Sequence, residues 1–307
     1  MTDENKQEVQ VPVTPDLPIE EIQDPPTPTS LTTAEIDQPQ QVYAENTSFS
    51  SVPHIVICGE SGVGKTHLAA SSPDGLCLDI EDGAGSEFDN DHRIVYNPGD
   101  PDLALKILKN VEGIKKYKRD GEYIVSPNGI RFHHIVVDTL DILFKNATEQ
   151  YIGRAKMNGN QLASIQNGLK AGNFNAIRME LKDYGAVNTL VSPLINKILS
   201  IGIPVVWITH EGGQKAQYYP NGGLQKMGEL RLGVGGQIGE MVQNLGHATI
   251  FVMYDPFKNQ RVILTKPQVY DDRRVYAKDR HSIFPKGVLP YERETTFLES
   301  FFSYFTW

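Results

Sequence analysis

Eight consecutive residues combine glycines, a lysine and a threonine in an order that suits phosphate binding. They are Gly59-Glu60-Ser61-Gly62-Val63-Gly64-Lys65-Thr66, that is, Gly, four residues, then Gly-Lys-Thr. Glycines let a backbone wrap an anion with its N–H groups pointing inward, and a helix beginning here presents its positive end. Lys65 would reach the β- and γ-phosphates of a nucleotide, and the Thr66 hydroxyl would hold Mg²⁺. The alternative is a Gly-rich turn that binds nothing.

The elements around this loop favour the phosphate-binding interpretation. The apolar residues 54–58 predict a buried strand before the loop, and residues 67–70 continue as a helix. Residues 75–79, 134–138 and 205–208 predict three more buried strands. Ligands bind beyond the carboxyl ends of strands in open parallel sheets. The residues that follow these strands are therefore the candidates for chemistry.

Two carboxylates follow predicted strands. Glu81 comes after the strand at 75–79, where it would polarise the water that attacks the γ-phosphate. An acidic loop without a catalytic role explains Glu81 equally well on the pattern alone. Asp138 ends the strand at 134–138 and would hold Mg²⁺, directly or through water.

A histidine and a pair of cations are further candidates. His210 lies just beyond the carboxyl end of the predicted strand at 205–208. A polar side chain there can sense the γ-phosphate or support local hydrogen bonds. Lys278 and Arg280 are separated by one residue and would project on the same side of a strand. They would reach across a subunit boundary and neutralise transition-state charge, or they are ordinary surface charges.

Residues 211–247 form a long Gly-rich stretch in which we expect a loop without regular elements. Such loops in compact domains are usually functional or mobile. Aromatic rings with basic residues between them suit single-stranded DNA, whose bases stack on the rings. A flexible surface loop of ordinary composition is the alternative. The candidate DNA-binding residues are Lys215, Tyr218, Tyr219, Lys226 and Arg231.

Apolar periodicity outlines the rest of the chain. We expect a helix over 101–116, and a second helix through 187–199 that Pro193 either kinks or starts. Residues 248–254 and 260–265 predict two strands joined by a turn. The aromatic residues of 297–305 fall on one helical face, which we expect to dock on the body or on a neighbouring subunit.

The charge of this 307-residue chain is concentrated in its first fifty residues. The net charge is −9, and residues 1–50 hold ten acids and one base, so residues 51–307 are neutral. The same fifty residues hold seven prolines and almost no aromatics, a composition typical of disorder. The two cysteines, Cys58 and Cys77, fall in predicted core strands and suit a reduced compartment. Without a signal peptide or an apolar span, we expect a cytoplasmic protein with no membrane contact, in the host cytoplasm if phage-encoded.

These motifs together resemble the RecA-like ATPase superfamily, and specifically the compact phage-type ATPases related to single-strand annealing proteins and recombinases. The resemblance runs from about Pro53 to about Arg280. It implies that Glu81, in Asp79-Ile80-Glu81, is the catalytic base, and that Asp138 before Thr139 is the magnesium ligand. It also implies DNA-binding loops at 151–184 and 211–247, and a role in trans for Lys278 and Arg280.

Further comparison with these ATPases bears on the sensor and on assembly. His210 stands where recombinases usually have Gln and some phage helicases have His. Leu31-Thr32-Thr33-Ala34 resembles the recombinase motif that clips onto a neighbouring protomer, although an ordinary Thr-rich linker explains it too. The separate N-terminal domain of the family has no counterpart, which favours annealing or accessory roles over autonomous strand exchange.

The sequence therefore predicts an α/β fold with one RecA-like core, a mostly parallel sheet flanked by helices. Its divisions are a disordered tail at 1–50, an ATPase core at 51–290 and an aromatic docking segment at 291–307. We expect a DNA-stimulated, Mg²⁺-dependent ATP hydrolase that binds single-stranded DNA, assembles into a ring or filament and supports phage recombination, annealing or replication. A single-strand DNA-binding protein is a further expected partner. The alternatives are a replicative helicase or helicase loader, a small-molecule phosphotransferase, and a module in which nucleotide only switches assembly.

Overall fold

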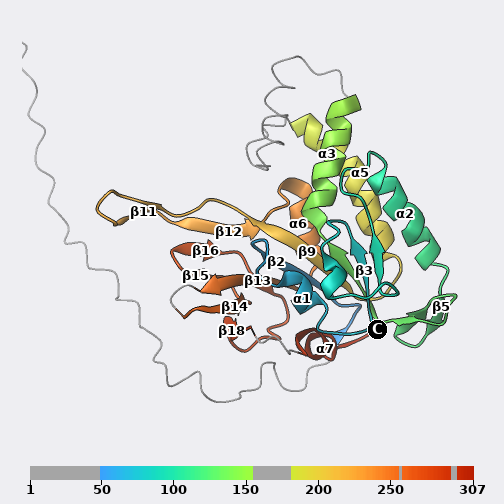
Figure 1. Cartoon of the computed structure of the whole chain (residues 1–307). Coiled ribbons are helices and arrows are strands. Elements are labelled where there is room, and N and C mark those ends of the chain that lie inside the picture. The colour runs from blue at the N-terminus through green and yellow to red at the C-terminus, as the bar shows by residue number, and fades with distance from the viewer. Residues whose placement is uncertain (1–48, 155–180, 256–257, 292–295) are drawn as a thin grey trace, which may run out of the picture. The chain divides into compact units, whose positions relative to one another are not determined.

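The computed structural model of the chain describes residues 49–154, 181–255, 258–291 and 296–307 (Figure 1). The predicted tail, apart from its last two residues, lies outside this range. Most of the predicted first DNA-binding loop at 151–184 lies outside it too.

A twelve-stranded sheet forms the centre of the described chain (Figure 1). Six of its strands are parallel neighbours, in the order β4, β3, β8, β9, β2 and β13. Their bounds are β2 (His54–Gly59), β3 (Gly75–Asp79), β4 (Arg93–Val95), β8 (His134–Asp138), β9 (Val205–Gly212) and β13 (Ala248–Asp255). With helices on both faces, this arrangement confirms the predicted α/β class with a mostly parallel sheet.

Further strands join this parallel core at β13 and at the end of β9. On one side β13 pairs with β14 (Gln260–Leu264) and β17 (Lys278–Asp279), and β14 pairs with β18 (Val288–Pro290). The end of β9, inside the parallel core, pairs antiparallel with β12 (Gly228–Leu232), which pairs in parallel with β16 (Arg273–Val275). β15 (Gln268–Tyr270) then pairs antiparallel with β16. The described residues also form three small separate sheets: β1 (Phe49–Ser50) with β19 (Phe305–Thr306), β10 (Gln217–Tyr218) with β11 (Leu224–Lys226), and β5 (Lys118–Asp120), β6 (Tyr123–Val125) and β7 (Arg131–Phe132).

Helices cover the sheet, and those at 140–154 and 236–245 are not among the predicted ones. The helices are α1 (Lys65–Ala69), α2 (Leu103–Ile114), α3 (Leu140–Arg154), α5 (Leu181–Leu199), α6 (Gly236–Leu245) and α7 (Phe297–Phe302), with a 3₁₀ turn η2 (Ala84–Ser86). α5 passes through Pro193 as one helix, so the proline does not mark its start. Within the described residues, none of these helices combines the length and hydropathy of a membrane span.

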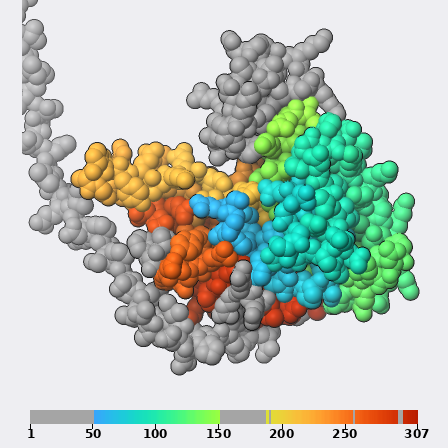
Figure 2. Space-filling view, viewed as in Figure 1, coloured from blue at the N-terminus to red at the C-terminus, as the bar shows by residue number. Residues whose placement is uncertain are grey.

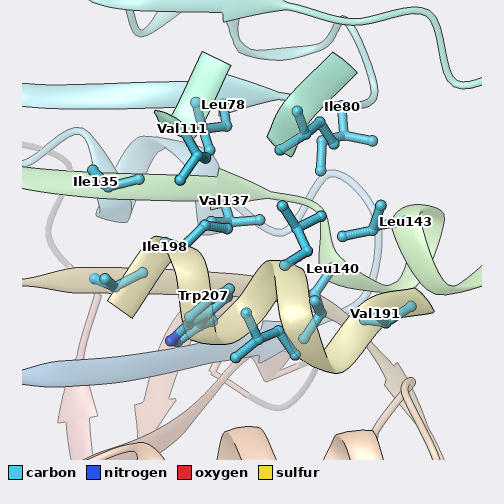
Figure 3. Packing of buried hydrophobic residues seen from close by; sticks show 14 of the residues in the cluster. Leu78, Ile80, Val111, Ile135, Val137, Leu140, Leu143, Val191, Ile198 and Trp207 are labelled. Atoms are coloured by element: carbon cyan, nitrogen blue, oxygen red, sulfur yellow. The ribbon is translucent and has the colours of Figure 1, made fainter. Parts of the chain in front are cut away.

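Successive residues of the central strands face opposite sides of the sheet and fill two cores. Val137 and Trp207 belong to the core under α2, α3, α5 and α6, which Figure 3 shows in part. Their neighbours Val136 and Ile208 belong to the core on the other face, together with Leu68 of α1. Because both faces are covered, the strands read as continuous apolar runs rather than as an alternating pattern.

The aromatic segment at the C-terminus packs on the body of its own chain. Phe297, Phe301 and Phe302 of α7 are buried in the core on the α1 side, where Phe284 stacks on Phe297 and Phe301. The backbone N–H of Leu298 donates a 3.2 Å hydrogen bond to the Ser71 hydroxyl just after α1. This segment therefore closes the face of the sheet that carries α1.

The expectation of a loop without regular elements over 211–247 is wrong. β9 continues to Gly212, and β10, β11, β12 and α6 follow within that stretch. β10, β11 and the turn between them extend away from the central sheet as an arm (Figures 1 and 2). We call residues 213–227 the ribbon. The strands of the ribbon are short and pair only with each other, Gln217 with Lys226 and Tyr218 with Leu224.

Candidate nucleotide-binding site

The Gly-rich loop connects β2 to α1 at the carboxyl edge of the parallel strands. In the strand register Gly59 pairs with His210 on one side and with Val252 on the other. A Cβ atom at Gly59 would lie 2.2 Å from the Val252 carbonyl oxygen, so no side chain fits there. Since α1 has only five residues, the N–H groups of the loop must supply most of the attraction for an anion.

The two predicted metal ligands, Thr66 and Asp138, lie in direct contact. The Thr66 hydroxyl donates a 2.7 Å hydrogen bond to Asp138 Oδ2, although 72 positions separate the two residues. Burial raises the pKa of Asp138 to about 6, and the hydrogen bond from Thr66 offsets only part of that rise. Lys65 is buried beside them and donates a 2.7 Å hydrogen bond to the Glu60 carbonyl. A cation near the buried carboxylate would favour its ionised form.

These residues fit a magnesium ion. Mg²⁺ prefers oxygen ligands and is usually held by one or two carboxylates together with substrate phosphates. Thr66 and Asp138 offer one hydroxyl and one carboxylate at the mouth of a phosphate loop. Within the ranges that the structure describes, no group of three or more His, Cys, Asp or Glu side chains is arranged to hold a metal ion by itself. The phosphates of a nucleotide would complete the coordination.

Glu81 is held in place by the loop that follows β3. Asp79, fully buried, accepts hydrogen bonds from the backbone N–H groups of Gly83 and Ala84 and from Arg93. These bonds fix the turn that carries Glu81. Burial raises the pKa of Glu81 above its ordinary value, while the nearby His210 offsets part of the rise. A carboxylate with a raised pKa is a better proton acceptor than an exposed one.

His210 joins Glu81 to a third acid. Its Nδ1 lies 2.7 Å from Asp141 Oδ2 and 3.8 Å from Glu81 Oε1, and its backbone N–H donates to Asp141 Oδ1 at 3.0 Å. Because a carboxylate only accepts, Nδ1 carries the proton. The bond to Asp141 raises the pKa of His210. Burial alone would raise the pKa of Asp141, yet the bonds from His210 hold it below its ordinary value.

The structure thus brings together five of the predicted site residues, Lys65, Thr66, Glu81, Asp138 and His210. It also adds Asp141, which the sequence analysis missed. The available signal was an acid in the first turn of the helix that follows the strand of Asp138. His67, after Thr66, pairs with Glu87 at 2.7 Å and so ties α1 to the loop of Glu81.

The predicted cations Lys278 and Arg280 lie at the opposite edge of the sheet in their own chain. Lys278 pairs with Thr249 at the amino end of β13, whereas Val252 pairs with Gly59 of the loop. The three intervening steps span about 10 Å. Both side chains bind carbonyls at the end of α6, Lys278 that of Gln243 at 2.8 Å and Arg280 that of Asn244. Cations are favourable at a helix C-terminus.

The candidate DNA-binding residues divide into two groups. Lys215, Tyr218, Tyr219 and Lys226 are exposed on the ribbon. Arg231 lies instead on β12, where its guanidinium stacks 4.3 Å from the centre of the Tyr276 ring and pairs with Glu229 at 3.1 Å. Arg231 is therefore fixed by its neighbours at the base of the ribbon.

The prediction of two buried reduced cysteines agrees with the structure. Cys58 and Cys77 are free thiols in β2 and β3. Cys58 donates to the His210 carbonyl at 3.3 Å and so packs directly beneath the site. Burial raises the pKa of the Cys58 thiol, which makes it a poor nucleophile. Neither cysteine is a candidate for the chemistry.

Comparison with known proteins shows the family of the chain. No curated protein is similar enough to match the chain. Among solved structures the chain is similar to the crystal structure of the RadB recombinase, with 13% sequence identity, a TM-score of 0.37, and coverage of 80% of this chain and 90% of that chain. This likeness is too weak to carry a functional conclusion. A family model described as an AAA domain matches residues 52–281. That match takes in well over half of the chain, so the protein belongs to this AAA domain family and is a P-loop NTPase.

Proposed function

We propose that the protein is a RecA-like ATP hydrolase that uses Mg²⁺ and is stimulated by single-stranded DNA. The observation that carries this proposal is the cluster at the carboxyl edge, where the 2.7 Å bond joins Thr66 to Asp138 and His210 lies between Glu81 and Asp141. A site built only to hold a nucleotide has no need of a half-buried carboxylate in front of the loop.

The residues divide the work of hydrolysis. Lys65 binds phosphate oxygens once it leaves the Glu60 carbonyl, and the loop N–H groups hold the same phosphates from behind. Thr66 and Asp138 would hold Mg²⁺, which would supply neutralising charge at the phosphates. Glu81 accepts the proton of the attacking water. His210, whose Nδ1 proton is donated to Asp141, lies 3.8 Å from Glu81 and senses whether the γ-phosphate is present.

The ribbon is the proposed DNA-binding element. Tyr218 and Tyr219 are about half exposed, at 51% and 52%, and lie between the exposed Lys215 and Lys226. Rings offer stacking surfaces to unpaired bases, and lysines neutralise phosphates. The ribbon springs from β9 directly after His210 and Glu211, so DNA bound there acts on the strand that carries the sensor. We therefore propose that DNA binding stimulates hydrolysis through this strand.

The oligomer is part of the proposal. In a ring or filament, Lys278 and Arg280 would complete the site of the neighbouring protomer. For that they must release the α6 carbonyls that they bind within their own chain. We propose a role in phage recombination, annealing or replication, with a single-strand DNA-binding protein as a further partner.

The decisive experiment measures ATP turnover with and without single-stranded DNA over a series of salt concentrations. We expect Mg²⁺-dependent turnover that DNA stimulates and that salt weakens steeply. Lys65→Ala should abolish nucleotide binding. A wild-type protein that neither binds nor hydrolyses ATP would overturn the proposal. A monomer whose turnover ignores DNA but responds to a small-molecule acceptor would favour a phosphotransferase instead.

A further inference from the structure

Two side chains from distant parts of the sequence reach the phosphate loop from outside the cluster. Val252 of β13 pairs with Gly59 of the loop, and Tyr254, two positions further along β13, pairs with Arg261. β14 therefore starts near the carboxyl ends of the parallel strands. Val262 of β14 pairs with Pro290 of β18. Tyr291 then lies beside Arg261, and its backbone N–H donates to the Arg261 carbonyl at 3.2 Å.

Tyr291 contacts the loop at its last glycine. Its hydroxyl donates a 2.9 Å hydrogen bond to the carbonyl of Gly64. A Cβ atom at Gly64 would lie 2.4 Å from that hydroxyl, and Gly64 has a φ of +99° that favours glycine. The Tyr291 ring centre lies 6.4 Å from that of His67. The tyrosine therefore packs on the loop backbone just before the two residues that would hold phosphate and metal.

Arg261 lies on the same backbone, and most of its donors have no partner among the described residues. Its guanidinium donates to the Gly62 carbonyl at 3.4 Å and lies 5.6 Å from the centre of the Tyr291 ring. In the part of the chain that the structure describes, Arg261 forms no ion pair with an acid. One long bond to a neutral carbonyl is weak for a group with five N–H donors arranged to match phosphate oxygens.

We infer that Arg261 is a positioning residue for the nucleotide of its own chain. Its guanidinium turns from the Gly62 carbonyl to a phosphate of the bound nucleoside triphosphate, while Tyr291 holds the loop and the arginine in register. The inference rests on the proposed nucleotide site. Arg261 would act within its own chain, in addition to Lys278 and Arg280, which are proposed to act on the neighbouring protomer. An arginine held at the loop backbone is close enough to meet phosphates wrapped by that loop, and charge-assisted bonds are the strong ones.

Equilibrium titration with fluorescent mant-labelled AMP-PNP and Mg²⁺ tests the inference. Arg261→Gln removes the charge and should weaken binding by about tenfold or more, as expected for the loss of a bond to a charged group. Arg261→Lys restores the charge without the fork and should bind between the glutamine variant and the wild type. Tyr291→Phe keeps the ring but loses the bond to Gly64, and we expect a smaller loss. Thermal melts establish that each variant is folded.

The matched control is Arg274→Gln, the same substitution at an exposed arginine of β16, which should bind like the wild type. The inference fails if Arg261→Gln also binds like the wild type while Lys65→Ala does not bind. It fails as well if the lysine and glutamine variants lose equal affinity, because the arginine would then only brace the loop. If the wild type binds no nucleotide, the proposed function itself fails, which is a different outcome.

Discussion

Asp141 accepts two hydrogen bonds from His210, one from the backbone N–H at 3.0 Å and one from Nδ1 at 2.7 Å. These two bonds fix both the backbone and the imidazole of His210 near the carboxyl end of β9. The pair also shifts both protonation equilibria, because the bond raises the pKa of His210 and lowers that of Asp141.

Asp141→Asn should reduce stability in a pH-dependent way. The raised pKa of His210 gives stability that is complete below its unfolded value of about 6.5 and is lost as pH rises through the folded pKa. The lowered pKa of Asp141 gives stability that is present above about pH 4 and is lost as pH falls through its folded pKa. The wild type should therefore exceed the variant by about 1–3 kcal/mol near pH 5 to 6, and by less at pH 9. Urea denaturation at both pH values measures this difference, and an equal difference at both would show that the pair is not ionic.

Glu81→Gln should separate binding from chemistry. Glutamine keeps the size of the side chain but cannot accept the proton of water, so kcat should fall by about 10²- to 10⁴-fold with nucleotide affinity unchanged. Because burial raises the pKa of Glu81, wild-type kcat/KM should fall with decreasing pH from a point above the ordinary glutamate value of about 4.3. Turnover by the variant equal to that of the wild type would remove Glu81 from the mechanism.

Thr66→Ala should abolish ATP turnover at every Mg²⁺ concentration. The substitution deletes the hydroxyl that contacts Asp138 and leaves the buried carboxylate without that donor, so its pKa should rise above about 6. Thr66→Ser keeps the hydroxyl and is the matched control, with turnover within a few-fold of the wild type. Magnesium titrations of ATPase activity compare the three proteins. If alanine and serine behave alike, the hydroxyl is not a metal ligand.

The sequence predicts the central part of this molecule well because its signals are local. A phosphate-loop motif lies between a strand and a helix, and Glu81, Asp138 and His210 each follow an apolar run, so parallel pairing alone brings them together. Arg261 and Tyr291 could not be predicted in this way. They reach the loop only because β14 and β18 pair at the far side of the sheet, and Tyr291 is 227 positions from Gly64. The strands of the ribbon are close together in the sequence, but they could not be predicted either, because they carry little apolar pattern.

Phe301→Ala should destabilise the protein by about 3–5 kcal/mol, the usual cost of truncating a buried phenylalanine. Phe301 is fully buried against Phe284, Phe302 and Phe305 in its own chain. The loss should therefore be independent of protein concentration. Glu299→Ala changes an exposed position of the same helix and should stay within about 0.5 kcal/mol of the wild type. A loss that disappears at high protein concentration would place the aromatic helix in a subunit interface.

Tyr219→Ala and Lys226→Ala should weaken the binding of single-stranded DNA in different ways. Loss of a stacking ring should cost about 1–3 kcal/mol at every salt concentration, because stacking does not depend on counterions. Loss of one lysine that contacts a phosphate should reduce the slope of log K against log salt by about 0.7. The controls are Tyr254→Ala, whose tyrosine is 50% exposed outside the ribbon, and Lys109→Ala on α2. Fluorescence anisotropy with labelled oligo(dT) at several salt concentrations measures both quantities. If the control variants lose as much affinity as the ribbon variants, binding is a general surface effect and the ribbon is not the DNA site.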